Sequence, residues 1–402
     1  MPHWFLLLCL IGMSSSTRVA AQEWSRWADE LPHPRASTAV APDAARDTPR
    51  QAPAPPLSRP PAAVRALYVN AWAFGSSRFY DLVRLADTTE VNALVIDVKD
   101  DTGYLTYPSK VATAIAIGAN GEPRARDVSA RLRLLAERGI HPIARIVVAK
   151  DPLLARGKPG WAIQSSEGGL WVDRQGRPWV DAFNDSVWTY AAELAAEAVR
   201  LGFAEVQYDY VRFPDESRAR MATAVYPARR EGESQREGVR RNLAVVGERT
   251  RALGVPFTID VFGLTTSTEG DLGIGQHWHD LVTVADVVLP MVYPSHYYRG
   301  FYDITKPNFE PYRVVKRALE DGIRRTREAG GSAEIRPYLQ AFTLGPPRYE
   351  PTHVREQIRA AEELGIMSWV LWNPRSAYQA GIFRPQETAE PPAGSASPAG
   401  RR

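Results

Sequence analysis

Carboxylates stand in three apolar, strand-like runs of this 402-residue sequence. The run ALVIDVKDD carries Asp97 and Lys99, VQYDYVRFP carries Asp209 and Arg212, and FTIDVFG carries Asp260. A charged side chain in an apolar strand is costly to bury without a partner. Because the arrangement recurs, we expect these groups to share one site. Two carboxyl groups on either side of a scissile bond are what glycoside hydrolysis uses.

Asp209 and Asp260 are the predicted catalytic pair. Alternate residues of a strand share a face and neighbouring strands lie about 4.8 Å apart, so both carboxyl groups can point into one cleft. We predict Asp209 as nucleophile or base and Asp260 as general acid. Arg145 or Arg212 would keep one of the carboxylates ionised. The alternative is that the two aspartates only form structural ion pairs with these arginines.

Polar and aromatic residues near the ends of the strand-like runs are the predicted substrate contacts. They are Asp97, Lys99, Arg145, Arg212, Tyr293, His296, Gln340, Trp372 and Asn373. The long segment 149–184 adds Trp161, Trp171 and Trp179, whose indoles can stack on sugar rings or instead pack together to fix the loop. Within it, the string GGLWVDRQGRPWVDAFN predicts a hairpin centred on 174–176.

Two histidines have the composition of a metal site but not its spacing. His277 and His279 are two residues apart, which is poor spacing for one helix face, and no third ligand is evident. We therefore predict neither a metal nor a cofactor. A metal-dependent hydrolase that uses Asp97 and Asp100 together with the two histidines is an alternative, which an added chelator would expose.

Eight short β-branched or aromatic runs must position these side chains. They span residues 64–70, 93–98, 141–148, 204–211, 256–262, 287–293, 335–340 and 368–372. Segments with helical spacing lie between them, over 186–201, 238–253 and 352–364. Glycines stand where helices would end, at Gly139, Gly202, Gly254 and Gly365. The alternation predicts a parallel sheet and a single (β/α)8 TIM barrel with long βα loops; an open doubly wound sheet is the alternative, but its glycine-rich first turn is missing.

The composition argues against several classes of protein. The 49 basic and 46 acidic residues give a net charge of +3, too small for a nucleic-acid binder that relies on counterion release. Cys9 is the only cysteine, so no disulfide can form within one chain. Beyond the N-terminus no run of about 18 apolar residues occurs, so we predict no membrane span in the mature chain.

The two ends of the sequence differ from its centre. Residues 1–21 hold a short apolar core and end in small residues, which predicts a signal peptide cleaved after Ala21. The protein would then be exported, either periplasmic or secreted, whereas an uncleaved membrane anchor or a buried N-terminal helix is the alternative. Proline and alanine enrich 22–62 and 385–402, which predicts a disordered linker and a disordered tail around a barrel domain over 63–384.

Several strings of the sequence are similar to one known family. VRALYVNAW, IDVKDDTGYL, GFAEVQYDYVRFP, IDVFG, DVVLPMVYPSHY, RPYLQAF and SWVLWN occur in that order. Over 64–378 the chain resembles the bacterial putative glycosyl hydrolase domain family DUF4015, a TIM-barrel family of alpha-amylase-like character. The resemblance implies the barrel fold, action on a polysaccharide, and a nucleophile role for Asp209. Many relatives in the wider group place Glu where this chain has Asp260, so Asp97 or Asp101 stays open as the acid.

These patterns together predict an exported glycoside hydrolase. Its substrate would be an oligo- or polysaccharide of the cell envelope or an exopolysaccharide. A non-catalytic glycan-binding barrel is the alternative, and it would bind oligosaccharide equally well after Asp209→Asn, without turnover by either form. A separation of about 5–5.5 Å between the Asp209 and Asp260 carboxyl groups would indicate a retaining hydrolase, and about 6.5–9.5 Å an inverting one.

Overall fold

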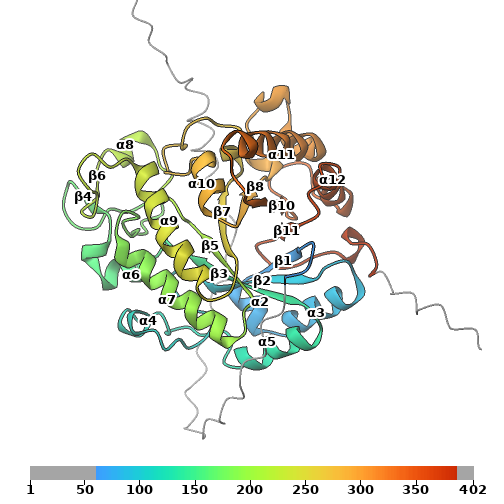
Figure 1. Cartoon of the computed structure of the whole chain (residues 1–402), viewed down its shortest axis with the longest axis horizontal. Helices are drawn as coiled ribbons and strands as arrows, with labels where there is room; N and C mark the ends of the chain where they lie inside the picture. Colours follow the sequence, from blue (N-terminus) through green and yellow to red (C-terminus); the bar gives the residue numbers. More distant parts are fainter. Residues whose placement is uncertain (1–59, 387–402) are drawn as a thin grey trace, which may run out of the picture.

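One parallel sheet closes on itself in the computed structural model, which describes residues 60–386 (Figure 1). Its strands are β1 (Arg65–Val69), β2 (Ala93–Lys99), β3 (His141–Val147), β5 (Glu205–Asp209), β7 (Phe257–Phe262), β8 (Val287–Met291), β9 (Glu334–Ile335), β10 (Tyr338–Gln340) and β11 (Trp369–Trp372). β11 pairs with β1, and β10 pairs with both β11 and β8, so the ring has no open edge between first and last strands. The barrel prediction is confirmed, and the open doubly wound sheet is excluded.

The predicted seventh strand is divided into two pieces. β9 pairs with β8, whereas β10 pairs mainly with β11, and Arg336 and Pro337 lie between the two pieces. Proline has no backbone N–H to give to a sheet ladder, which is why a continuous strand does not form there. The Pro337 carbonyl still accepts a hydrogen bond from the backbone N–H of Val370 at 3.0 Å, so the barrel wall stays closed.

Helices on the crossovers surround the strands (Figure 1). They are α2 (Ala71–Gly75), α3 (Arg78–Thr88), α4 (Ala112–Ala116), α5 (Val128–Glu137), α6 (Pro152–Gly157), α7 (Asp185–Leu201), α8 (Arg218–Met221), α9 (Gln235–Arg251), α10 (Trp278–Val284), α11 (Pro311–Glu328) and α12 (Pro351–Glu362). The four predicted stop glycines all have positive φ, between 65° and 118°. None of the helices within 60–386 is long and apolar enough to cross a bilayer.

Two long loops join into one unit at the carboxyl end of the barrel. The loop after β3 carries β4 (Gln164–Ser165) and the loop after β5 carries β6 (Ala224–Val225), and these short strands pair antiparallel. The predicted hairpin at 174–176 is present, with a bridge between Val172 and Pro178. The predicted signal peptide and most of the predicted linker and tail lie outside the described residues.

A buried ion pair joins the strands at the opposite end of the barrel. Arg336 donates to the Glu205 carboxylate at 2.7 Å, and both side chains are almost fully buried. Burial raises the pKa of Glu205, but the charge of Arg336 and the nearby His141 more than offset it, so the pKa lies below its usual value. The carboxylate is therefore ionised and depends on its cation.

Arg336→Leu should lower the free energy of unfolding by about 3–5 kcal/mol at pH 7, because Glu205 would be left as an uncompensated buried charge. Urea unfolding followed by circular dichroism measures this loss. Arg327→Leu on the exposed face of α11 is the matched control, expected to change stability by less than about 0.5 kcal/mol. Equal losses in the two variants would contradict the assigned role of the ion pair.

Candidate active site

Arg145 on β3 lies at the centre of the carboxylate cluster. Its guanidinium donates to Asp97 through Nη1 at 2.5 Å and to Asp209 through Nε at 3.1 Å and through Nη2. The same Nε lies 3.7 Å from the Asp260 carboxylate. The strand register explains the first contact, since Arg145 stands directly beside Asp97 of β2. One cation therefore contacts three carboxyl groups from three other strands.

Asp209 is held on both of its oxygens. Its Oδ2 accepts from Arg145, and its Oδ1 accepts from the backbone N–H of Tyr210 at 2.5 Å. Tyr210 has a positive φ of 53°, a left-handed conformation that is strained for a tyrosine. Such strain is often found at functional sites, where the fold holds it in place. These donors fix the orientation of the Asp209 carboxyl group.

Asp260 lies deeper than the sequence predicts. Its side chain is fully buried, and Gln207 donates to its Oδ1 at 2.6 Å. Burial, and next the charge of Asp209, raise the pKa of Asp260 well above its usual value. The carboxyl is thus protonated, but it does not line the cavity above it, and the Arg145 guanidinium lies against both this carboxyl and Asp209. This geometry argues against Asp260 as the acid that meets a substrate.

A cavity of about 330 Å³ opens above this cluster at the carboxyl ends of the strands. Seven of the predicted site residues line it: Asp97, Arg145, Asp209, Arg212, Tyr293, His296 and Trp372. Burial lowers the pKa of His296 to about 3, so this imidazole is neutral and its Nδ1 shares a hydrogen bond with Ser295. The structure therefore brings together most of the set that the sequence predicts.

Lys99 does not reach the cavity because β2 contains a bulge. Asp97 stands beside Arg145 but Lys99 stands beside Ile146, so one extra residue turns Lys99 to the opposite face of the sheet. There its ammonium bonds the buried Asp151 carboxylate at 2.6 Å and lies over the ring of Tyr190. The predicted substrate contact at Lys99 is thus replaced by an internal ion pair.

Gln340 and Asn373 also lie outside the cavity lining. Gln340 is fully buried, and its side chain accepts from the backbone of Ser295 at 3.0 Å and donates to the backbone of Phe342 at 3.0 Å. Asn373 donates to the Ala341 carbonyl at 2.6 Å. Both amides fix the loops that follow β8, β10 and β11, so they support the site without facing it.

A second group of carboxylates lies on the walls of the cavity, above the strands. Asp100 and Asp101 follow β2, and Asp215 and Glu216 lie in the loop after β5. Burial, and next the charge of Asp101, raise the pKa of Asp100 to about 7. Lysine and arginine are absent from the contacts of Asp100 within 60–386; its partner is Thr102, whose backbone N–H donates at 2.9 Å. Asp100 is therefore a carboxyl that exchanges its proton near neutral pH.

Tyr68 on β1 is a site residue that the sequence analysis missed. Its hydroxyl donates to Asp97 at 2.5 Å, and its ring stacks on Trp372 with centroids 3.7 Å apart. Burial raises the pKa of Asp97, while the charge of Arg145 lowers it. The alternation along β1 would have placed Tyr68 and Asn70 on one face, and both line the cavity.

The three tryptophans of the loop after β3 have different environments. Trp171 is buried and its indole donates to the Arg220 carbonyl at 3.1 Å, which ties this loop to the loop after β5. Trp179 lines the cavity and donates to Asp173 at 3.0 Å. Trp161 packs against the core without lining the cavity. The packing interpretation thus holds for Trp171 and Trp161, whereas stacking of Trp179 on a sugar ring stays a prediction.

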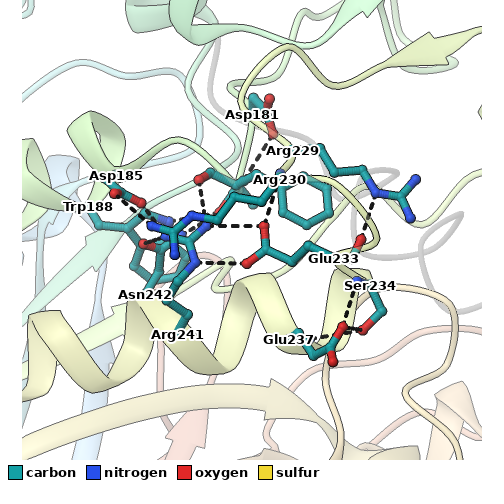
Figure 2. A network of polar contacts seen from close by, with 12 residues as sticks. Asp181, Asp185, Trp188, Arg229, Arg230, Glu233, Ser234, Glu237, Arg241 and Asn242 are labelled. Carbon is teal, nitrogen blue, oxygen red and sulfur yellow. Dashed lines mark hydrogen bonds and ion pairs between the residues drawn. The ribbon is translucent and has the colours of Figure 1, made fainter.

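A polar network anchors these joined loops to α7 and α9 (Figure 2). The Asp181 carboxylate accepts from the backbone N–H of Ala228 at 2.9 Å, across the two loops. Arg241 of α9 bonds Glu233 at 2.8 Å and also Asp185 at the start of α7. α9 begins at this point with a reciprocal Ser234–Glu237 capping box. The cavity wall made by the two loops is therefore fixed to the outer helices.

The residues of the predicted metal-dependent alternative are not brought together. Asp97 and Asp100 line the cavity, whereas His277 and His279 do not, and His277 lies 3.5 Å from Asp280 beside α10. Across residues 60–386, no group of three or more His, Cys, Asp or Glu side chains has the geometry to hold a metal ion. The geometry gives this alternative no support.

Comparison with known proteins identifies a family. The DUF4015 family, described as "Putative glycosyl hydrolase domain", matches residues 66–378. A hypothetical protein from Ruminiclostridium thermocellum is 37% identical, over 46% of this chain and 92% of its own, with a TM-score of 0.42. The PgaB (BpsB) glycoside hydrolase domain from Bordetella bronchiseptica is 14% identical over 78% and 95%, with a TM-score of 0.54, and shares the fold. None of the curated proteins matches the chain.

Arg145→Met should lower the free energy of unfolding by about 3–5 kcal/mol at pH 7, because its carboxylates lose their cation. Arg145 lowers the pKa values of Asp97 and Asp260, so its removal raises them further. A carboxyl with a raised pKa in the folded state loses stability as the pH rises through that pKa. The loss should therefore be smaller at pH 5 than at pH 7, as urea unfolding at both values measures.

Arg313→Met on the surface of α11 serves as the control, with little change expected at either pH. A loss of equal size at pH 5 and pH 7 would show that Arg145 stabilises the fold by packing rather than by its charge.

Proposed function

The chain belongs to the DUF4015 family of putative glycosyl hydrolase domains, and on this premise we propose that it hydrolyses glycosidic bonds with Asp209 as nucleophile or base. The observation that carries the proposal is the position of Asp209, which lies at the floor of the cavity with both oxygens held by donors. A carboxylate fixed beneath a cavity is suited to attack an anomeric carbon or to activate a water.

We assign the role of general acid to Asp100, on the wall of the cavity. Asp100 faces the cavity, and its pKa of about 7 keeps a large share of the carboxyl protonated at neutral pH. General acids work best when their pKa lies near the working pH. In this mechanism Asp100 gives its proton to the glycosidic oxygen as the bond to the leaving sugar breaks, while Asp209 acts from below.

The aromatic residues support a carbohydrate as the substrate. Trp72, Trp179 and Trp372 all contribute to the cavity lining, together with Tyr68 and Tyr293. Flat rings provide apolar surface on which the faces of sugar rings can pack. We place the activity on a polysaccharide of the cell envelope or on an exopolysaccharide, outside the cytoplasm. Export through the segment 1–21 stays a prediction.

Asp209→Asn should abolish turnover, with a loss of about 10³-fold or more, because an amide is neither a nucleophile nor a base. Reducing-end release from a panel of bacterial polysaccharides measures turnover, and calorimetry with the same glycans measures binding. Asp81→Asn on the exposed surface of α3 is the matched control and should retain activity. If neither wild type nor variant turns over any glycan while both bind with the same affinity, the protein is a glycan-binding barrel.

Asp100→Asn should lower kcat by about 10²- to 10⁴-fold on natural linkages and much less on aryl glycosides, whose leaving groups need no proton. In the wild type, deprotonation of Asp100 removes the acid, so kcat should fall as the pH rises through about 7. The variant should lose this alkaline limb. An unchanged alkaline limb, or an equal loss on both substrate types, would assign the acid role to another residue.

A further inference from the structure

Arg212 differs from the other cations that line the cavity because it has no carboxylate partner. The others are in ion pairs, which are Arg124–Glu122, Lys150–Asp101 and Arg145 with both Asp97 and Asp209. Within residues 60–386, no carboxylate lies at ion-pair distance from the Arg212 guanidinium. The residue lines the cavity and is only 6% exposed. The described residues thus leave the charge of Arg212 uncompensated.

Aromatic rings hold this charge in place. The guanidinium carbon of Arg212 lies over the rings of Phe262, Tyr210 and Trp179, at 4.5, 4.7 and 5.3 Å from their centroids. Burying an unpaired charge is costly, and cation–π contacts offset part of that cost. They cover the faces of the guanidinium, whereas its N–H groups point outward in its plane. The rings therefore orient Arg212 without using its hydrogen-bond donors.

Most of these donors remain for a bound molecule. A guanidinium has five N–H groups. Nη1 of Arg212 donates to the Phe213 carbonyl at 3.0 Å, and the side chain makes no other hydrogen bond to the residues that the structure describes. Nε and Nη2 form the planar edge that matches the two oxygens of a carboxylate. Because Arg212 lines the cavity, a ligand there can supply such a group.

The position of Arg212 relates this group to the proposed nucleophile or base. Arg212 follows Asp209 by three residues, and three residues of chain span at most about 11 Å. A group held by Arg212 would thus belong to the sugar above Asp209 or to its direct neighbour. A carboxylate carries one negative charge and a phosphate monoester nearly two, so the carboxylate meets less repulsion from the acidic side chains of the cavity.

We propose that the substrate is an acidic glycan whose sugars carry carboxylates, and that Arg212 binds one of these carboxylates through both oxygens. This inference rests on the proposed function and adds the substrate class. A neutral glycan would leave the buried charge of Arg212 uncompensated, so the site would discriminate against it.

The first experiment compares glycans that differ only in this group. Uronate-containing polysaccharides of several linkages, each also with its carboxyl groups reduced to primary alcohols, are given to the full chain. We expect a kcat/KM about tenfold higher or more for a carboxylate form, because hydrogen bonds between charged groups are the strong ones. Equal kcat/KM for both forms, or turnover of neutral glycans alone, would overturn the inference and leave the hydrolase function intact.

The second experiment removes the guanidinium. Arg212→Gln should reduce the preference for the carboxylate form, measured as the ratio of the two kcat/KM values, to within about twofold of unity. Arg218→Gln, exposed in the same loop, is the matched control and should keep the wild-type ratio. If Arg212→Gln does not fold, Arg212→Lys decides, since an ammonium keeps the charge without the fork and should lower the ratio severalfold. An unchanged ratio in the folded variant would contradict the inference.

Binding separates failure of the inference from failure of the proposed function. If no glycan is turned over, calorimetry with Asp209→Asn and the same pairs of polysaccharides decides. Tighter binding of a carboxylate form, lost when Arg212→Gln is added, would support the substrate class while removing the hydrolase proposal. Equal binding of both forms, or no binding of any carboxylate form, would overturn the inference.

Discussion

The Arg145 guanidinium is the interaction on which the site depends. Arg145 contacts carboxyl groups from β2, β5 and β7, and without this cation the Asp97 and Asp209 carboxylates would repel one another at the floor of the cavity. Arg145 can serve all three because its donors form a planar fork, whereas a lysine would act as a single point charge. The closed sheet provides the register, with Asp97 directly beside Arg145. The strand register that closes the barrel therefore also sets the contacts between Arg145 and the carboxyl groups at the floor of the cavity.

The carboxyl groups form two levels that differ in their environment. At the floor, Asp97 and Asp209 are tied to Arg145, and Asp260 is protonated beneath them by burial. On the wall, the described residues place no such cation against Asp100, and burial and the charge of Asp101 raise its pKa to about 7. A two-carboxylate hydrolase needs one group held ionised and one held protonated. In the proposed mechanism, the proton donor and the nucleophile or base therefore come from different levels of the cavity.

The sequence predicted the strands and the floor well because both follow short-range rules. Strand-like runs that end in charged residues had to meet at one end of a parallel barrel, which correctly placed Asp97, Arg145 and Asp209. Lys99 and Asp260 do not line the cavity, for local reasons that the alternation of side chains along a strand does not reveal. A bulge turns Lys99 away, and the depth of Asp260 within β7 keeps it below the cavity. The wall carboxylates come from loops, whose paths depend on long-range contacts such as the β4–β6 pairing.

Substitutions at the floor of the cavity and substitutions on its walls should have different structural effects. The floor is fixed by the register of the sheet, so any substitution there disturbs several strands through Arg145. The wall made by the loops after β3 and β5 is fixed separately, by the β4–β6 pairing, by Asp181 across the two loops, and by Arg241 between α7 and α9. Charges on the walls can therefore vary without moving the floor. The strands therefore fix the position of Asp209 and Arg145, whereas the loops shape the cavity above them.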